Sequence, residues 1–165
     1  MPKIKMAEIP PYLVIKDTRE KEGKGWTFPS DDYCLGTVQK GLPTGDYSIE
    51  GYTDKFVVER KATTSELCTN IYEPRWEKEL DRLDKIPHSF LIFEFSYQNI
   101  CEFPLNSHIP QRLWYKVKMS AEFMQKCIAK WSLNHSCKIL FAEKNGQALC
   151  KNLMHYFMKY GRDEE

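Results

Sequence analysis

The chain has 165 residues, which is enough for one domain that buries most of its apolar surface and too few for two domains of ordinary size. Its formal net charge is only +1, so the molecule as a whole does not attract nucleic acid, and any such contact has to come from local patches. No apolar run approaches the length of a membrane span, which argues against a membrane protein.

The six cysteines give a further constraint. They spread from Cys34 to Cys150 and none belongs to a C-x-x-C pair, so their spacing does not favour a zinc site. Three of them fall in helical patterns and are expected to be small buried side chains: Cys68, Cys127 and Cys150. The simplest interpretation is a reduced, intracellular setting, which is the cytoplasm or, in a eukaryote, the nucleus.

The N-terminal part of the chain begins with a polar stretch, residues 1–11, which we expect to be a loose arm. An apolar run with β-branched residues follows at Tyr12–Lys16 and predicts a strand in the interior of a sheet. Its C-terminal end carries three charged side chains: Asp17, Arg19 and Glu20. Taken alone, this cluster is explained equally well by a charged loop and by part of a functional site.

A second strand is expected at Cys34–Gln39, followed by two strands, residues 45–50 and 55–61, that a tight turn joins. If residues 51–54 form this turn, Asp46 lies opposite Glu59 with the Cβ atoms about 5 Å apart. Strand alternation places Lys61 on the same face as Glu59. The opposite face of this hairpin is apolar and requires a core: Tyr47, Ile49, Phe56 and Val58.

These charges suggest a specific chemistry. Two carboxylates at that separation repel each other, and the repulsion raises a pKa unless a cation lies between them. A hard divalent ion such as Mg²⁺ removes the repulsion, binds through few protein oxygens, and keeps places for water and phosphate. Lys61 can then orient a water against phosphorus. The alternative, a surface hairpin with solvated charges, is the more common case for such fragments when they occur in isolation.

Two helices are expected after the hairpin. Thr64 or Ser65 is expected to cap a short helix that runs through Cys68. Pro74 stands where the first turn of a helix tolerates proline, and an apolar stripe follows at helical spacing: Trp76, Leu80 and Leu83. Residues 89–95 then read as an apolar strand.

The remaining chain starts with an irregular segment, residues 97–116. Its aromatic residues and nearby cations could form a nucleic-acid surface, although a packed surface loop is more frequent: Arg112, Lys116 and Lys118. A long helix is predicted next by one apolar face: Phe123, Met124, Cys127, Ile128 and Trp131. A strand at residues 138–142 precedes a last helix, capped by Asn145, whose expected stripe is Leu149, Leu153, Tyr156, Phe157 and Tyr160.

The order is therefore a strand, a three-stranded meander, and then helices alternating with strands. This order predicts an α/β protein in which helices flank a mixed central β-sheet. We expect a single domain at residues 12–161, with residues 162–165 as a polar tail.

The motifs resemble those of a known family. Gly45-Asp46-Tyr47, followed by Glu59-Arg60-Lys61, is similar to the Gly-Asp…Glu-Arg-Lys signature of XPF-type structure-specific endonucleases, in the PD-(D/E)XK, restriction-endonuclease-like group. The similarity extends upstream to residues 14–20. Downstream it includes Arg75-Trp76…Leu80…Leu83 and residues 90–94, so that in order and spacing it covers residues 12–160. The three motifs together are far more specific than any one of them.

The resemblance implies a restriction-endonuclease-like core and a metal-dependent DNA endonuclease that cuts branched, flapped or otherwise structured DNA in repair or recombination. Asp46 and Glu59 would hold Mg²⁺ or Mn²⁺, and Asp17 would bind the metal directly or through water. Lys61 would position the attacking water, and Glu20 would complete the catalytic set as an orienting partner for an arginine. The expected phosphate contacts are Arg19, Arg60 and Arg75.

Two departures and one alternative accompany this resemblance. The family has an aspartate where this chain has Ser65, and Glu66, the next residue, would enter the site only through a shift of register. We also expect no room for the helix-hairpin-helix module with which many family members dimerise, although a homodimer or heterodimer is compatible with the sequence. The alternative is a catalytically silent DNA-binding subunit of a nuclease heterodimer. Such a subunit is expected to lose an acid or the lysine, and this chain has all three.

Overall fold

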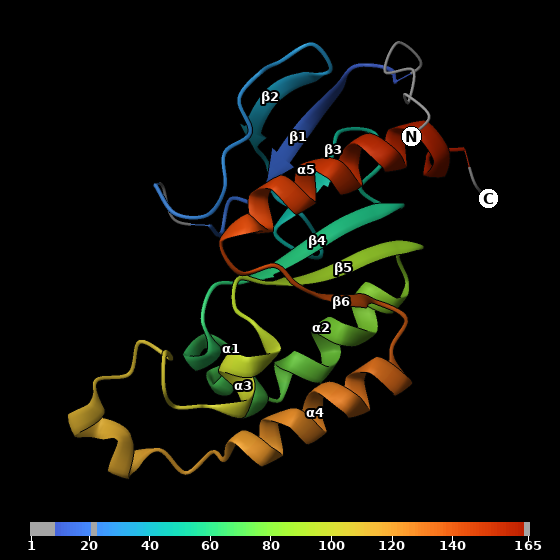
Figure 1. Cartoon of the computed structure of the whole chain (residues 1–165). Coiled ribbons are helices and arrows are strands. Elements are labelled where there is room, and N and C mark those ends of the chain that lie inside the picture. The colour runs from blue at the N-terminus through green and yellow to red at the C-terminus, as the bar shows by residue number, and fades with distance from the viewer. Residues whose placement is uncertain (1–8, 21–22, 164–165) are drawn as a thin grey trace, which may run out of the picture.

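Within the part of the chain that the computed structural model describes, residues 9–20 and 23–163, six strands form one mixed sheet in the order β2-β1-β3-β4-β5-β6 (Figure 1). The strands are β1 (Tyr12–Lys16), β2 (Cys34–Gln39), β3 (Tyr47–Ile49), β4 (Phe56–Lys61), β5 (His88–Phe93) and β6 (Lys138–Phe141). Residues 1–8 of the expected arm and 164–165 of the expected tail lie outside the described residues.

The strand directions correct one expectation. β2 runs parallel to β1 at the edge of the sheet and does not pair with β3, so the predicted three-stranded meander is wrong. Burial gives the reason: β1 is apolar on both faces and fits between two strands, with Val14 and Ile15 fully buried. β2 exposes Leu35 by 61% and Val38 by 39%, which suits an edge.

The central hairpin has the register that the turn length predicts. β3 and β4 are antiparallel, and Tyr47 lies opposite Val58, which continues to Asp46 opposite Glu59. Gly45 precedes this pair with φ +80°, and a Cβ there would lie 2.1 Å from a methyl group of Val57. Only glycine fits this position without strain, so Gly45 fixes the entry of the chain into β3.

Helices cover both faces of the sheet, as expected for the α/β class (Figure 1). One face carries α1 (Thr64–Ile71), α2 (Arg75–Asp84), α3 (Tyr97–Cys101) and α4 (Ala121–Asn134), and the other carries α5 (Gly146–Tyr156). Short helical turns occur at Gln111–Lys116 and Glu143–Asn145, and a π-helical turn, Phe157–Gly161, continues α5. Among the described helices, none has the length and apolar character needed to cross a membrane.

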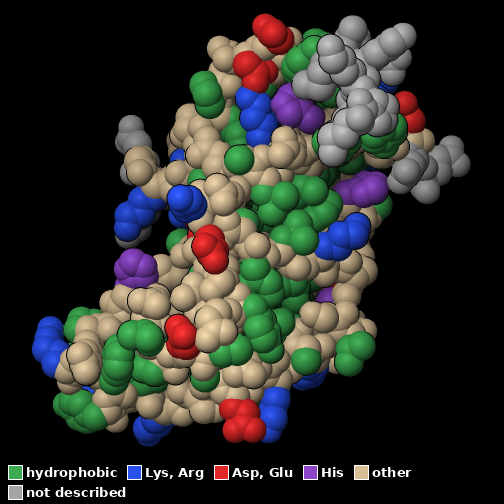
Figure 2. Space-filling model, viewed as in Figure 1, with side chains coloured by type: hydrophobic (Ala, Val, Ile, Leu, Met, Phe, Trp, Pro, Cys, Tyr) green, Lys and Arg blue, Asp and Glu red, His purple; other side chains and the backbone are tan. Residues whose placement is uncertain are grey.

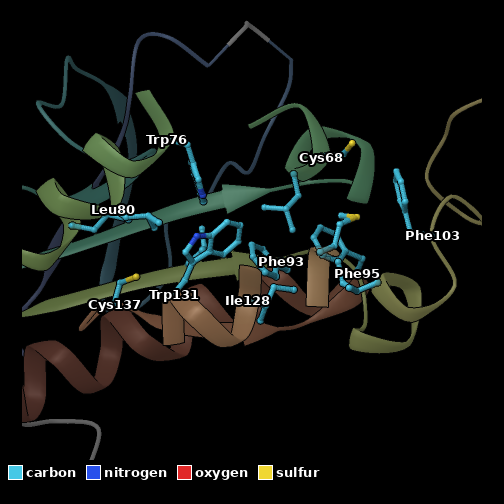
Figure 3. Close-up of a cluster of buried hydrophobic side chains, with 14 of the residues drawn as sticks. Cys68, Trp76, Leu80, Phe93, Phe95, Phe103, Ile128, Trp131 and Cys137 are labelled. Atoms are coloured by element: carbon cyan, nitrogen blue, oxygen red, sulfur yellow. The ribbon is translucent and has the colours of Figure 1, made fainter. Parts of the chain in front are cut away.

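Two apolar clusters follow from strand alternation in β4 and β5. Val57, Leu91 and Phe93 point towards α2 and α4, where the rings of Trp76 and Trp131 meet edge to face with centroids 5.6 Å apart (Figure 3). The opposite face packs against α5 and contains the predicted apolar side of the hairpin: Tyr47, Ile49, Phe56 and Val58. Because both clusters are filled, β4 is held rigidly from two sides.

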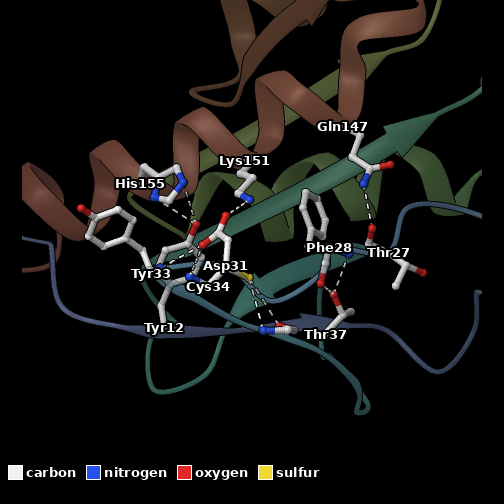
Figure 4. A network of polar contacts seen from close by, with 11 residues as sticks. Tyr12, Thr27, Phe28, Asp31, Tyr33, Cys34, Thr37, Gln147, Lys151 and His155 are labelled. Carbon is white, nitrogen blue, oxygen red and sulfur yellow. Dashed lines mark hydrogen bonds and ion pairs between the residues drawn. The ribbon is translucent and has the colours of Figure 1, made fainter. Parts of the chain in front are cut away.

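Polar contacts attach α5 to the segment between β1 and β2 (Figure 4). Lys151 forms an ion pair with Asp31, and Gln147 Nε2 donates to the carbonyl of Thr27 at 2.7 Å. The hydroxyl of Tyr12 lies 3.1 Å from Nδ1 of His155. These contacts hold α5 against β1 and the segment that follows it, and residues 17–20, directly after β1, lead into the site described below.

Several predicted boundaries change in the helical half. Thr63 caps α1, because its side chain accepts from the Glu66 amide, so the expected cap at Thr64 or Ser65 is wrong. The segment expected to be irregular, residues 97–116, contains α3 and a 3₁₀ turn. The stripe predicted for the last helix is partly confirmed, because Phe157 is buried and Leu149 and Leu153 pack partly buried against the same cluster. Tyr156 and Tyr160 are exposed by 44% and 61%, and the buried positions that the prediction left out are Cys150, Met154 and Met158.

Candidate active site

A polar cleft of about 300 Å³ lies at the C-terminal end of β4, next to α1 and α2. Five acids, four bases and one amide line it: Arg19, Glu20, Asp46, Glu59, Arg60, Lys61, Glu66, Asn70, Arg75 and Glu79. Seven of the eight site residues predicted from the sequence are in this set. The eighth, Asp17, does not line the cleft.

β4 places Glu59 and Lys61 on one face, as alternation predicts, and both side chains are buried. Lys61 Nζ lies 3.1 Å from Glu59 Oε1 and 4.7 Å from the ring centroid of Trp76 in α2. Burial lowers the pKa of Lys61, but the charges of Glu59 and Glu66 outweigh it, so the pKa is raised. Lys61 is therefore a fixed cation at neutral pH.

Asp46 lies in the cleft at the position immediately before β3. The backbone N–H of Arg60 donates to its Oδ2 at 2.8 Å, which fixes the carboxylate beside β4. Burial, and then the charge of Glu59, raise the pKa of Asp46 well above its ordinary value, while the Arg60 N–H opposes them. Burial likewise raises the pKa of Glu59 to about 7, against the opposing charge of Lys61. The positive charge of Lys61 therefore compensates only part of the cost of burying the two carboxylates.

The carboxylate of Asp17 is engaged inside the fold. Oδ1 accepts from the Leu42 amide at 2.8 Å, Oδ2 accepts from Nε of Arg19 at 2.5 Å, and the side chain is almost fully buried. Its backbone N–H donates to the carbonyl of Asp46 at 2.8 Å. This geometry makes Asp17 a support for Arg19 and Asp46, and its predicted role as a metal ligand stays a prediction.

The three predicted phosphate-binding arginines line the cleft in different environments. Arg19 and Arg75 have side chains exposed by 63% and 75%. Arg60 is more enclosed: it forms an ion pair with Glu94, and its guanidinium carbon lies 5.5 Å from the ring centroid of Trp26. Burial lowers the pKa of Arg60, but Glu94 first, and Glu20 to a smaller extent, raise it. The sequence predicted that Glu20 acts on one of the three arginines, and in the structure its charge acts on Arg60.

Sequence reasoning missed two lining residues and misjudged a third. Glu66 and Asn70 lie one turn apart on α1, and Glu79 lies one turn after Arg75 on α2. Glu66 needs no shift of register, because Oε2 accepts from the Ala62 amide at 2.8 Å and the side chain lies along the cleft. The available sequence signal was helical spacing: Asn70 lies four residues after Glu66, and Glu79 lies four residues after Arg75.

Another polar cluster joins the C-terminal ends of α2 and α4. Ligand atoms of Asp81, Asp84 and His135 lie within 4.8 Å of one another, an arrangement that could accept a metal ion. Nδ1 of His135 lies 2.6 Å from Asp84 Oδ2, and the Ser136 amide donates to Asp84 Oδ1 at 2.8 Å. None of these residues lines the cleft. The hydrogen bonds of Asp84 with His135 and Ser136 link the ends of the two helices, which explains why these polar side chains lie together.

Comparison with known proteins supports the fold. No protein-family model matches the chain, and no curated protein matches it. The solved structure of XPF from Aeropyrum pernix superimposes with a TM-score of 0.61 at 19% sequence identity, covering 93% of this chain and 64% of that one. XPF from Aeropyrum pernix in complex with DNA gives a TM-score of 0.59 at 19% identity, covering 93% and 68%. The chain thus spans less than two thirds of the first structure. The superposition and the mixed sheet flanked by helices confirm the predicted α/β fold class.

Proposed function

We propose that this chain is a metal-dependent DNA endonuclease that hydrolyses phosphodiester bonds. One observation carries the proposal: Asp46, Glu59 and Lys61 meet in one cleft, on a fold similar to that of XPF. The XPF structure in complex with DNA adds support for DNA as the partner. Branched or flapped DNA as the preferred substrate, a role in repair or recombination, and dimer formation belong to the same proposal.

The residues present fit a hard divalent cation. Asp46 keeps Oδ1 and Glu59 keeps Oε2 without a described protein donor, so two carboxylate oxygens remain for Mg²⁺ or Mn²⁺. Burial, and for Asp46 also the charge of Glu59, raises the pKa values of both carboxyls, and a bound cation would favour their ionised forms. When bound, the ion supplies Lewis acidity and a water of lowered pKa.

The surrounding residues divide the remaining work. The ammonium of Lys61, held by Glu59 and the Trp76 ring, orients the attacking water by donating a hydrogen bond and stabilises charge that develops on the phosphate oxygens. Arg19 and Arg75 are exposed at the cleft and contact phosphates of the bound strand. Asp17 holds Arg19 in place, and Glu20 acts on Arg60.

The test is cleavage of a labelled branched duplex with Mg²⁺, with Mn²⁺ and with a chelator, together with calorimetric titration of Mn²⁺. We expect cleavage only with a divalent ion, and we expect Asp46→Asn to lose both Mn²⁺ binding and cleavage while it stays folded. Cleavage that persists in the chelator, or unchanged Mn²⁺ affinity in Asp46→Asn, would contradict the proposed site. No structural observation favours a silent subunit, because the acids and the lysine lie together.

A further inference from the structure

A second groove lies beside the cleft, on another side of α1. It has a volume of about 390 Å³ and is lined by Ser65, Cys68, Thr69, Tyr72, Ile109, Lys116, Val117, Lys118 and Met119. It continues into a hollow of about 310 Å³ lined by Tyr72, Lys118, Met119, Ser120 and Phe123. We call these two together the α1 groove. Figure 1 places α1 near the segment that leads to α4.

The charge and composition of the α1 groove differ from those of the neighbouring cleft. Its lining residues include two lysines and no acid, although the whole chain has almost equal numbers of acids and bases. Cys68 and Met119 are buried, whereas Tyr72 and Phe123 expose 62% and 51% of their surface. At the lower left of the molecule, where Figure 1 shows the segment that leads to α4, Figure 2 shows basic and apolar side chains next to one another. Exposed aromatic rings beside cations suit a polyanion with flat, unstacked bases.

Helix geometry connects the groove to the cleft. Ser65, Thr69 and Tyr72 recur at helical spacing and face the groove, while Glu66 and Asn70 follow one residue later and face the cleft. The two sites are therefore separated only by α1, whose diameter with side chains is about 10 Å. A nucleic-acid strand that leaves the cleft and crosses α1 reaches the groove directly.

We propose that the α1 groove binds a single-stranded DNA segment continuous with the strand in the cleft. Bases stack on Tyr72 and Phe123, and phosphates contact Lys116 and Lys118. This inference rests on the proposed function, which already includes flapped DNA, and adds to it the place on the protein where the single-stranded arm lies. A groove of this volume accepts one or two nucleotides, and a base that is paired and stacked in a duplex does not offer its face to a tyrosine ring.

The test uses the full chain with Ca²⁺ in place of Mg²⁺, and measures binding of three labelled DNAs by fluorescence anisotropy. These are an oligothymidylate of about ten nucleotides, a duplex with a single-stranded arm, and the same duplex with a blunt end. Tyr72→Ala is expected to lower the affinity for the oligothymidylate and for the armed duplex roughly tenfold, and to leave the affinity for the blunt duplex unchanged. Tyr72→Phe keeps the ring and is expected to bind like the wild type. Lys118→Ala is expected to reduce the salt dependence of armed-duplex binding by about one counterion.

The matched control is Tyr160→Ala. Tyr160 is exposed by 61%, close to the 62% of Tyr72, and a lysine ammonium lies 5.2 Å from its ring centroid, but it lines a different hollow at the end of α5. Its removal is expected to change none of the three affinities. A loss with Tyr160→Ala as large as with Tyr72→Ala would overturn the assignment to the α1 groove.

The outcomes separate this proposal from the proposed function. Unchanged binding of the armed duplex by Tyr72→Ala, or an equal loss for the blunt duplex, overturns the groove as a single-strand site even if the wild type cuts DNA. The former result would be expected if the groove instead held a protein partner. Oligothymidylate binding that depends on Tyr72, in a chain that never cuts DNA, supports the groove and contradicts only the proposed function.

Discussion

At the scale of single residues, the site combines a buried acid, Glu59, and a half-buried acid, Asp46, with one fixed cation, Lys61. Glu59 and Asp46 have raised pKa values mainly because burial disfavours their charged forms, and Lys61 compensates only part of the negative charge. In the metal-free protein these carboxylates are therefore a cost that a bound cation removes. This residue-level imbalance is the physical basis of the proposed metal site.

The first prediction concerns the pH dependence of stability without metal. The pKa of Glu59 is raised to about 7 from 4.5, so the folded protein keeps a proton that the unfolded chain has released between those values. The resulting stabilisation is present below pH 4.5 and is lost as the pH rises through 7. Glu59→Gln stays neutral at every pH and should remove this pH-dependent loss, so the variant should be more stable than the wild type at pH 8 by on the order of 1–3 kcal/mol.

The measurement is thermal unfolding in a chelator at pH 5.5 and at pH 8, for both proteins. The comparison between variant and wild type matters because burial lowers the pKa of His155, which acts in the opposite direction in both proteins. A stability difference between the two proteins that does not grow with pH would show that Glu59 has no raised pKa. Added Mn²⁺ should stabilise the wild type more at pH 8 than at pH 5.5.

The second prediction decides between two roles for Asp17. If it supports Arg19, as its hydrogen bonds indicate, Asp17→Asn should leave Mn²⁺ affinity near that of the wild type and weaken DNA binding. The asparagine oxygen can still accept from the Leu42 amide, so the fold should survive. A loss of Mn²⁺ affinity of tenfold or more in calorimetry would instead restore Asp17 as a metal ligand.

At the scale of secondary-structure elements, the caps and turns around β4 position the site. Thr63 caps α1, and the carboxylate of Glu66 accepts from the Ala62 amide, so the helix starts directly after β4. We predict that Thr63→Ala lowers the free energy of unfolding by about 1 kcal/mol and that Ser65→Ala has a smaller effect. Chemical denaturation of both variants checks this, and a larger loss for Ser65→Ala would contradict the assignment of the cap.

The sequence was informative where local rules determine the structure. A four-residue turn sets the hairpin register, and alternation in β4 then brings Glu59 and Lys61 to the same face as Asp46. The sequence was uninformative where the structure depends on contacts between segments far apart in the chain. Nothing in residues 34–39 specifies pairing with β1 instead of β3, and the Leu42 amide that occupies Asp17 lies 25 residues away.

The last helix illustrates another limit. Two apolar rows run along α5, one through Leu149 and Leu153 and the other through Cys150 and Met154, and they are offset by one residue. Periodicity alone does not say which row faces the sheet. The second row is fully buried, while the first continues to the exposed rings of Tyr156 and Tyr160.

At the scale of the whole molecule, two packed clusters hold the sheet so that β4 ends at an open polar cleft. The α1 groove lies on another side of the helix that follows β4, so one element separates proposed chemistry from proposed strand binding. Affinity for DNA should therefore be spread over many residues, whereas the rate of cutting should depend on a few. DNA affinity and the rate of cutting should therefore respond to different substitutions.

The most direct measurement is single-turnover cleavage of a branched duplex at saturating protein, with affinity measured separately in Ca²⁺. Lys61→Ala should retain most DNA affinity and lose roughly 100-fold in rate, equivalent to about 3 kcal/mol of transition-state stabilisation. Arg75→Ala, the matched control, should bind more weakly and with altered salt dependence, but cut at nearly the wild-type rate once saturated. If Lys61→Ala cuts saturating DNA as fast as the wild type, the cluster of Asp46, Glu59 and Lys61 is not a nuclease site.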